Sequence, residues 1–392
     1  MRILSVHNRY LQRGGEDQSR EAEEQLLIEH GHEVIRLEES NERVTQLGPL
    51  RTAARTVWSR ESHARADALI RAHRPDVMHV QNFFPLISPS VYYAAHAHRV
   101  PVVQSLRNYR LLCLNAYLLR DDQPCELCLG RSVAWPGVRY RCYRGSRAAS
   151  AVVAAMDSTH NLLRTWTRRV TRFIALTGFT RQKYIEGGFP ADRIVVKPNF
   201  LSEDPGAGVG ERSGAVFVGR LSPEKGLRTL LEAWQVIRTA EPLRIIGDGP
   251  DRGMVEEWAA KYSKVDYLGK RSIAEVYDAM KRSKVLVFPS LWYETFGRTI
   301  VEAFATGTPV VASRIGAAAE LVNDGETGWL FTPGGVDDLA RILGATLGNA
   351  KALNRAGRAA RTTYETRYTA ALNYNALLNI YESAIGACGI HS

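Results

Sequence analysis

The sequence contains no uncharged run of 18 or more apolar residues, which argues against a membrane-spanning helix. Cysteine is scarce: only five are present, and four of them lie between positions 113 and 142, so an extracellular disulfide framework is not expected. The first residues become polar too soon for a secretory signal, and we expect a cytoplasmic protein. With 392 residues, 45% of them hydrophobic and 23% charged, the chain is long enough for two or three globular domains and is not of disordered composition.

Positive charge is concentrated in one part of the chain. The net charge is +10, and residues 1–200 carry 29 Lys or Arg against 19 Asp or Glu, whereas residues 201–392 carry 22 of each. Within the first half, residues 99–181 hold 14 Arg against four acids. Such a segment is either a solvated basic face or a surface for an anionic partner, such as a membrane surface or a phosphorylated substrate. Nucleic acid is not expected, because no zinc-finger, RNA-recognition or basic-zipper pattern accompanies the charge.

Short apolar segments alternate with helical segments along the chain. A strand at 2–6, a glycine loop, a helix and a strand at 33–37 are typical of the opening of a doubly wound parallel sheet. A Gly-rich polar segment at 202–213 predicts a linker, and the same alternation begins again at 215–218. We therefore predict an α/β protein with two Rossmann-like domains that face a central cleft, in which ligands bind at the carboxyl ends of the strands.

The predicted domains have the following bounds. The N-terminal domain spans 1–201 and carries a cysteine-bearing insert at 109–145. The second domain spans 214–365. The tail is expected to be helical, with a break near Arg367–Tyr368, and residues 366–392 are expected to form a helix that packs back on the N-terminal domain.

Two loops of the second domain carry residues suited to a nucleotide-sugar. After the strand at 215–218, Arg220 and Lys225 lie just before a helix start, where cations and unpaired backbone amides suit a diphosphate. Further along, Glu294 and Glu302 are eight residues apart, and Gly297 stands between them at the predicted start of a helix. Carboxylates can bind sugar hydroxyls while the helix-start amides face an anion. The alternative is a surface glutamate and a helix-capping glutamate.

Further short motifs surround these residues. They are Phe217 to Leu221, Glu224 to Gly226, Ile246 to Pro250, Glu294 through Glu302, and Asp324 to Gly328. With them the chain resembles, over nearly its whole length, the retaining glycosyltransferases of family four, which have the GT-B fold. The Glu-x7-Glu pattern with its flanks is the most specific motif. The N-terminal half is similar to a branch of that family with a Gly-Gly-Glu-Asp loop and a cysteine-bearing insert.

The resemblance implies roles for individual residues. Arg220 and Lys225 would hold the donor diphosphate and stabilise the leaving group. Glu294 would bind hydroxyls of the transferred sugar, and Glu302 would bind those of the ribose. The remaining donor-binding positions implied are Phe296, Gly297 and Arg298 through their amides, Gly15 through close backbone approach, and the backbone near Gly269 and Lys270 at the base. The resemblance implies no catalytic metal, because cationic side chains and amides supply the electrostatic stabilisation.

One position departs from the family pattern. Arg107 stands where members of the family often have a histidine, and an arginine cannot act as a neutral acceptor or as a base near pH 7. Arg107 could instead pair with a phosphate or an acidic sugar. His79, near the end of the predicted third strand, is a second candidate for acceptor or sugar contact, although a packed or capping histidine is the more common case. Both residues are therefore candidates for acceptor or sugar contact.

Four cysteines have the spacing C-x11-C-x2-C-x13-C. Cys113, Cys125, Cys128 and Cys142 are compatible with a closed structural zinc site of four thiolates. The alternative is four reduced cysteines that pack as small apolar side chains. A redox role is not expected, since the Cys-x2-Cys pair does not open a helix after a strand.

The favoured function is that of a retaining glycosyltransferase. It would move a sugar from a nucleotide-diphospho-sugar to a glycan or lipid-linked acceptor in cell-surface polysaccharide or glycolipid synthesis. The main alternative is a non-catalytic nucleotide-sugar-binding protein of the same fold. An epimerase would need an acidic or histidine set in the N-terminal cleft that we do not find.

The basic segment also predicts where such an enzyme works. Arginines accompany Trp58 and Trp166, and basic residues with tryptophan suit the headgroup region of an anionic membrane. We therefore expect a cytoplasmic enzyme that is peripheral on the inner membrane face. The residues behind this expectation are Arg51, Arg55, Arg60 and Val57 around Trp58, and Leu162, Leu163, Arg164, Arg168, Arg169 and Arg172 around Trp166.

Overall fold

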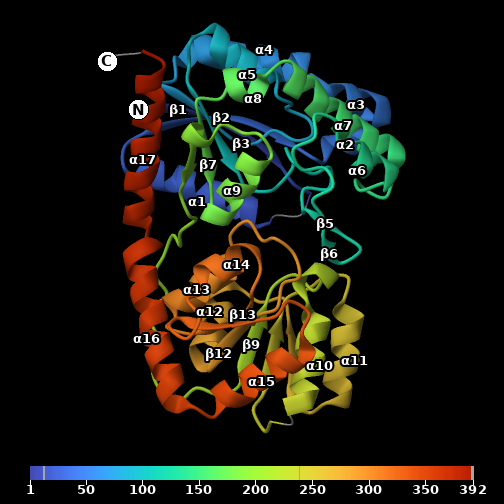
Figure 1. Cartoon of the computed structure of the whole chain (residues 1–392). Helices are drawn as coiled ribbons and strands as arrows, with labels where there is room; N and C mark the ends of the chain where they lie inside the picture. Colours follow the sequence, from blue (N-terminus) through green and yellow to red (C-terminus); the bar gives the residue numbers. More distant parts are fainter. Residues whose placement is uncertain (12–13, 238, 390–392) are drawn as a thin grey trace. The chain divides into compact units, whose positions relative to one another are not determined.

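The chain folds into two compact units (Figure 1). The computed structural model describes residues 1–11, 14–237 and 239–389, so the last three residues of the predicted terminal helix lie outside the described part. Unit 1 comprises Met1–Leu118, Cys125–Asn199 and Ala370–Ser392, and unit 2 comprises Leu119–Pro124 and Phe200–Thr369. Apart from the short segment Leu119–Pro124, the chain passes from unit 1 to unit 2 after residue 199, close to the end of the first domain that the sequence predicted at 201.

A six-stranded parallel sheet forms the centre of unit 1. Its strands are β1 (Arg2–Arg9), β2 (Glu33–Ser40), β3 (Val77–Asn82), β4 (Val102–Leu106), β7 (Arg172–Ala175) and β8 (Ile194–Val196). The strand order is β2-β1-β3-β4-β7-β8. The second strand thus pairs on one side of β1, and the third strand pairs on its other side. Every residue of β3 and β4 is buried, as expected for strands covered on both faces.

Helices cover the sheet of unit 1. They are α1 (Gly15–Glu29), α2 (Arg43–Leu47), α3 (Pro49–Val57), α4 (Arg60–His73), α5 (Ser90–Ala97), α6 (Trp135–Arg139), α7 (Arg147–Leu162), α8 (Thr165–Arg168), α9 (Gly178–Glu186) and α17 (Ala370–Ala387). Figure 1 shows α17 beside α1, and the two helices are in contact. Apolar residues of α17, among them Leu377 and Tyr381, pack in one cluster with Ile3, Val77 and Val103 of the strands. The last helix of the chain is therefore part of the core of unit 1.

The predicted insert at 109–145 contains little regular structure. It includes the two-residue antiparallel strands β5 (Leu119–Arg120) and β6 (Gln123–Pro124), followed by the short helix α6. The turn between β5 and β6 has positive φ at Asp121 and Asp122, of 52° and 56°. This type of backbone joins two antiparallel strands with the right twist, which explains why two aspartates occur there.

A second parallel sheet of six strands forms the centre of unit 2. The strands are β9 (Ala215–Val218), β10 (Leu243–Ile246), β11 (Val265–Gly269), β12 (Val285–Phe288), β13 (Val310–Ser313) and β14 (Gly328–Phe331), in the order β11-β10-β9-β12-β13-β14. The sequence did not predict β14, because only four residues form it and a glycine begins it. That glycine is required: a Cβ at Gly328 would lie 2.0 Å from the carbonyl oxygen of Val310 on the paired strand.

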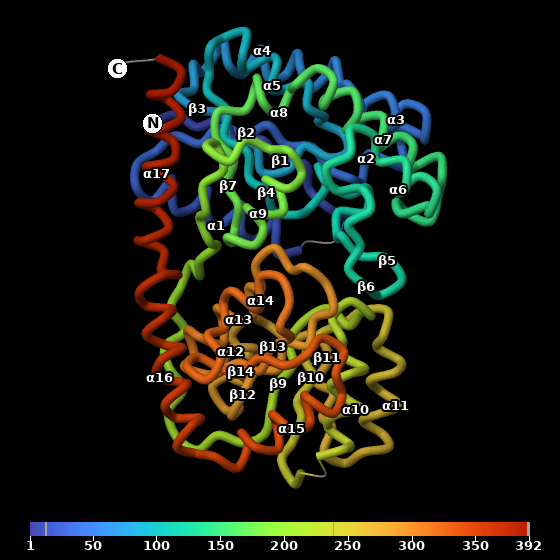
Figure 2. The backbone as a smooth tube through the Cα atoms, in the orientation of Figure 1, coloured from blue at the N-terminus to red at the C-terminus, as the bar shows by residue number. Residues whose placement is uncertain are grey.

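Seven helices of the described residues accompany this sheet. They are α10 (Leu227–Ile237), α11 (Arg252–Lys261), α12 (Ile273–Arg282), α13 (Arg298–Ala305), α14 (Gly316–Leu321), α15 (Val336–Leu347) and α16 (Ala350–Arg367). Leu230 and Trp234 of α10 and Leu343 of α15 pack with Val287 of β12 in the main cluster of unit 2. The predicted break in the tail is confirmed, since α16 ends at Arg367 and α17 starts at Ala370 (Figure 2).

Candidate active site

The strand order of unit 2 defines where a ligand site is expected. From β9 the chain proceeds to β10 on one side, whereas from β12 it proceeds to β13 on the other. The loops that leave β9 and β12 therefore diverge, and the carboxyl ends of these neighbouring strands form the topological switch point at which open α/β sheets bind ligands. The two loops are 219–226 and 289–297. They carry most of the residues that the sequence predicted for the donor.

Glycines allow the loops at this edge of the sheet to pack closely. Gly226 has φ of +67°, and a Cβ there would lie 1.9 Å from the carbonyl oxygen of Pro289. The amide of Leu291 also donates to the carbonyl oxygen of Glu224 at 2.9 Å. A Cβ at Gly247, after β10, would lie 1.8 Å from the carbonyl oxygen of Gly219. The turn at 247–250, with the sequence Gly-Asp-Gly-Pro, is thus an architectural element that supports the loop after β9.

The structure pairs two residues for which the family resemblance implied separate roles. Lys225 Nζ lies 2.5 Å from Glu294 Oε1, and the hydroxyl of Ser290 donates to the same oxygen at 2.8 Å. Glu294 is 7% exposed, and the ammonium of Lys225 also lies 5.4 Å from the ring centroid of Trp292. The ion pair fixes the position of Lys225, and a second carboxylate oxygen of Glu294 remains to bind a hydroxyl. Spacing along the chain could not reveal this contact, because 69 residues separate the two partners.

Arg220 differs from Lys225 in its surroundings. Its side chain is exposed at the end of β9, and within the described residues no ion pair or hydrogen bond involves its guanidinium. An exposed arginine at the switch point that has not been neutralised by a carboxylate can bind an anionic ligand without first breaking a contact. Its placement fits the predicted contact with a diphosphate, which stays a prediction.

The start of α13 supplies backbone amides close to these side chains. Gly297 precedes the helix with φ of +90°, and the first helical hydrogen bond runs from the amide of Ile300 to the carbonyl of Gly297. The preceding amides of the helix start point away from the helix body and suit an anion. Phe296 contributes its backbone there, while its ring is buried and lies 6.1 Å from that of Tyr368.

Glu302 lies one turn inside α13. It is 5% exposed, and burial raises the pKa of its carboxyl group. Arg298 counters this effect, because its Nε donates to Glu302 Oε1 at 2.9 Å. The predicted ribose-binding carboxylate therefore carries an arginine partner that holds it in place. The predicted amide donor Arg298 thus has a second, structural use for its side chain.

The remaining predicted donor positions of unit 2 lie two strands away. Gly269 ends the edge strand β11 with φ of +69°, and its carbonyl oxygen accepts a hydrogen bond from the amide of Gly247 at 3.0 Å. Lys270, the next residue, is exposed. The structure thus places both at the same carboxyl edge of the sheet as Arg220. Their contact with a base stays a prediction.

In unit 1, Gly15 occupies a comparable position. It begins α1 directly after the loop that follows β1, and β1 and β3 form the switch point of that sheet. Among the residues that the structure describes, a Cβ added at Gly15 would meet no heavy atom within 4 Å. Asp17 holds the residue before Gly15: its Oδ2 accepts from the amide of Gly14 at 3.1 Å, and its Oδ1 lies 2.8 Å from His7 Nε2. The backbone at Gly15 is therefore fixed and open to its surroundings.

His79 lies within unit 1 and not at an exposed edge. It is the third residue of the six in β3 and is 2% exposed. Its Nδ1 lies 2.7 Å from the hydroxyl of Tyr381, its Nε2 lies 2.8 Å from that of Ser105, and burial lowers its pKa to about 4. A sugar cannot reach a ring that is enclosed and bonded on both sides, so the expected sugar contact is corrected to a core histidine that ties α17 to the sheet.

Arg107 is also enclosed. Its residue is 6% exposed, and its guanidinium donates to Gln81, Asn199 and Glu23 at 2.8, 2.9 and 2.8 Å. These partners already take a donor from each of the three guanidinium nitrogens. The expected contact of Arg107 with an acceptor or sugar is therefore corrected as well: its charge is used inside unit 1.

The four clustered cysteines lie near one another in unit 1. Cys113 is buried, and the pKa of Cys128 is raised to about 11, by burial and by the proximity of the other three thiols. Among the described residues, however, no group of three or more His, Cys, Asp or Glu side chains is placed to hold a metal ion. Zinc would need the sulfurs within about 2.3 Å of one point. The zinc site stays a prediction.

Comparison with known proteins matches both halves of the chain. The family described as "Glycosyl transferase 4-like domain" matches residues 7–199, and "Glycosyl transferases group 1" matches residues 208–363. The chain belongs to the family-four glycosyltransferases of GT-B fold.

Individual curated relatives share about a third or less of their residues with this chain over the aligned part. The glycogen synthase of Mycobacterium tuberculosis is 33% identical over 41% of this chain and 40% of its own length. The phosphatidyl-myo-inositol mannosyltransferase of Mycobacterium leprae is 28% identical over 57% of this chain and 62% of its own. The match thus spans less than two thirds of either relative.

Solved structures share the fold along almost the whole chain. Anabaena HepE in complex with UDP superimposes with a TM-score of 0.69 at 19% identity, over 98% of this chain and 100% of that one. The sucrose-phosphate synthase of Thermosynechococcus elongatus gives 0.68 at 17% identity, over 98% and 99%. At these identities the likeness establishes the GT-B fold of two Rossmann-like domains.

Gly15 offers a test of the open backbone at the start of α1. Gly15→Ala should leave the free energy of unfolding almost unchanged, because the added Cβ meets no heavy atom of the described residues within 4 Å. It should nevertheless weaken the use of a nucleotide-sugar at least about tenfold in kcat/KM, if the backbone approaches the diphosphate. Urea unfolding and steady-state kinetics measure the two effects, and unimpaired kinetics would contradict the role of Gly15.

The zinc prediction is decided by elemental analysis. A site of four thiolates should hold about one zinc per chain, and the double variant Cys125→Ser/Cys128→Ser should lose it. Cys388→Ser is the matched control, because Cys388 is exposed and distant in sequence from the four. Metal-free protein of full stability would leave the cysteines as packing residues.

Proposed function

We propose that this protein is a retaining glycosyltransferase that moves a sugar from a nucleotide-diphospho-sugar to a glycan or lipid-linked acceptor, in cell-surface polysaccharide or glycolipid synthesis. The observation that carries the proposal is the group of complementary side chains at the switch point of unit 2. There the exposed Arg220, the Lys225–Glu294 ion pair and the amides before Ile300 lie on adjacent loops. Membership of the glycosyltransferase family supports the same reading.

The chemistry follows from the charge that develops when the glycosidic bond to the diphosphate breaks. Arg220 and Lys225 would stabilise the leaving diphosphate, and the amides of the α13 start would add fixed dipoles that need no reorganisation. Glu294 would hold Lys225 in position and bind hydroxyls of the transferred sugar with its other oxygen. These groups are proposed to act without a catalytic metal. A front-face mechanism asks for no separate base, because the acceptor hydroxyl can pass its proton to the leaving phosphate.

The donor and acceptor classes rest on relatives. The Anabaena structures contain UDP in one case and UDP-glucose in another, which supports a nucleoside-diphosphate sugar as the donor. The mycobacterial phosphatidyl-myo-inositol mannosyltransferase acts, by its name, on a lipid-linked acceptor. These likenesses favour a hexosyl donor and a glycan or lipid-linked acceptor for this chain.

A non-catalytic nucleotide-sugar-binding protein is the alternative. The buried Glu302 with its Arg298 partner would serve binding equally well. Transfer or slow hydrolysis of a nucleotide-sugar separates the two functions. A panel of nucleotide-sugars, tested for both binding and hydrolysis with purified protein, would reject the transferase if binding occurred with no turnover of any donor.

Membrane contact is proposed at the exposed part of the basic segment. The tryptophans do not provide it, since Trp166 is 4% exposed and Trp58 is half-buried. Leu50 and Leu162 are each 85% exposed instead, and the exposed Arg164 follows Leu162 in the chain. Exposed leucine next to arginine suits an anionic lipid surface. None of the helices within the described residues is long and apolar enough to span a membrane.

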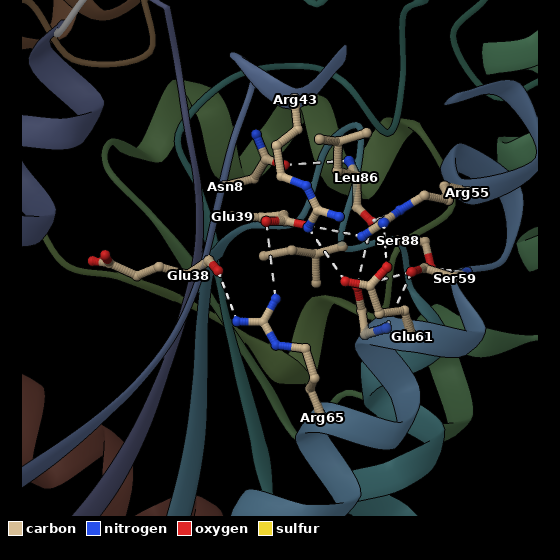
Figure 3. A network of polar contacts seen from close by, with 12 residues as sticks. Asn8, Glu38, Glu39, Arg43, Arg55, Ser59, Glu61, Arg65, Leu86 and Ser88 are labelled. Carbon is tan, nitrogen blue, oxygen red and sulfur yellow. Dashed lines mark hydrogen bonds and ion pairs between the residues drawn. The ribbon is translucent and has the colours of Figure 1, made fainter. Parts of the chain in front are cut away.

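Not every arginine of the expected membrane surface is available. Arg55 belongs to an ion-pair network in unit 1, in which its guanidinium lies 2.8 Å from Glu39 Oε2 and 2.5 Å from Glu61 Oε2 (Figure 3). Arg43 reaches the same two carboxylates from α2. The charge of Arg55 is therefore compensated, and the proposed surface rests on exposed arginines, of which Arg164 and Arg168 lie nearest in the chain to Leu162. It would place the enzyme on the cytoplasmic face of the membrane.

Arg220 tests the leaving-group role without disturbing the fold. Arg220→Ala should lower kcat about 10- to 100-fold, while the affinity for the donor nucleotide changes less, because charge on the diphosphate grows in the transition state. Arg355→Ala, an exposed arginine on α16 of the same unit, is the matched control and should be silent. A rise in KM with kcat unchanged would contradict the role.

The membrane proposal is tested by co-sedimentation with liposomes. The protein should sediment with anionic liposomes, less so as salt is raised, at roughly 1 kcal/mol per surface-proximal basic residue. Arg164→Glu/Arg168→Glu should abolish binding, whereas Arg355→Glu/Arg358→Glu, the same charge change on α16, should not. Equal binding to neutral liposomes, or none to either kind, would reject membrane contact and leave the transferase proposal intact.

A further inference from the structure

The chain passes between the two units at two points in addition to the short β5–β6 hairpin. It leaves unit 1 after Asn199 and returns at Ala370 (Figure 2). The first crossing follows β8, and the second lies in the short break between α16 and α17. The residues of unit 1 that flank these crossings share one cluster of buried polar contacts.

Glu23 of α1 is the centre of this cluster. Its Oε1 lies 2.7 Å from Lys197 Nζ, and its Oε2 accepts from Arg107 Nη2 at 2.8 Å and from Gln81 Nε2 at 2.8 Å. The side chains of the three charged residues are at most 2% exposed. One carboxylate in the interior of unit 1 thus serves two cations.

The two cations extend the cluster to both crossings. Arg107 Nη1 donates to Asn199 Oδ1 at 2.9 Å, and Asn199 is the last residue of unit 1 before the first crossing. Lys197 Nζ donates to Asn373 Oδ1 at 2.9 Å, in the first turn of α17 after the second crossing. Asn373 Nδ2 donates in turn to the carbonyl of Pro198 at 2.6 Å, which joins the two crossing segments directly.

Electrostatics make this cluster sensitive to small changes. The cations hold the pKa of Glu23 well below its usual range in spite of its burial, so the carboxylate is charged. Removing one member of a buried ion pair leaves an uncompensated charge and costs far more than losing a surface pair. The guanidinium of Arg107 reaches Glu23, Gln81 and Asn199 together because its nitrogens form a rigid fork, which an ammonium group cannot replace.

We propose that Glu23, Arg107, Lys197, Asn199 and Asn373 form a positioning cluster, which fixes both crossing segments to α1 and on which the rate of sugar transfer depends. The inference rests on the proposed function, since α1 begins at Gly15 and the crossings connect that helix to the unit with the donor loops. None of the five residues touches the donor in this proposal; they act through the segments that they hold.

A neighbouring buried ion pair serves as the control. Arg20 and Glu24 lie on the same helix with side chains 5% exposed, and Arg20 Nη1 lies 2.9 Å from Glu24 Oε1. Their other partners are Ser5, Arg36 and Glu38 of β1 and β2, which are not crossing segments. A variant of this pair reports what loss of a buried contact on α1 does by itself.

The experiment compares Arg107→Lys with Arg20→Lys. Both variants keep the charge, so the chain should fold, and circular dichroism verifies this. In Arg107→Lys we expect faster amide hydrogen exchange at 199–201 and at 370–374, a fall in kcat of at least about tenfold, and a Kd for UDP within about twofold of the original. UDP is the probe because all of its predicted side-chain contacts lie in unit 2, and only the backbone of Gly15 is predicted to approach it from unit 1. In Arg20→Lys all three quantities should stay near the original values.

The outcomes separate this inference from the proposed function. Unchanged exchange at both crossings in Arg107→Lys would overturn the cluster whatever the kinetics show. Faster exchange with an unaltered kcat would overturn its role in transfer, as would an equal loss of kcat in Arg20→Lys. If the original protein transferred no sugar from any donor, the proposed function would fail, and the exchange data alone would decide whether the cluster holds the crossings.

Discussion

All strands of both six-stranded sheets run parallel to their neighbours, and this constraint sets the position of the candidate donor-binding loops. Parallel strands need crossover helices, so all carboxyl ends of one sheet gather at a single edge. In unit 2 that edge brings the loop of Lys225 against the loop of Glu294. In unit 1 it places the start of α1 beside the end of β3. The glycines of the loops in unit 2 follow from the same crowding, as the short distances at Gly226 and Gly247 show.

Several charged side chains of unit 1 are buried in its interior. The face of α1 toward the sheet is largely polar: Asp17, Arg20, Glu23 and Glu24 are all buried, and each has a partner. Buried ion pairs stabilise little compared with apolar packing, but they admit few alternative arrangements. The helix is consequently fixed in register by specific contacts. The basic composition of this half of the chain is thus partly an internal requirement and only partly a surface for a partner.

The prediction of the fold succeeded where the local pattern was strong. Strands such as β12, with four apolar residues all buried, and helices such as α10, with a clear apolar side, were visible in the sequence. β14 was missed because four residues with glycine and tryptophan carry no strand pattern of their own, and pairing with β13 decides it. The residues of the donor loops were predicted because glycines and charged residues follow the ends of the strands. The contacts between these residues, such as the Lys225–Glu294 ion pair, could not be inferred from the sequence.

The sequence by itself determined the α/β class, the two domains, the linker and the family, since each depends on residues that are close along the chain. Only the tertiary structure decided which partners the individual polar and charged side chains contact. Arg107 and His79 stand after or within strands that suggested a ligand, yet their partners come from α1, from Asn199 and from Tyr381, up to 302 residues away. A side chain's charge can be read from sequence, whereas its burial and its counter-charge depend on which distant segments pack against it.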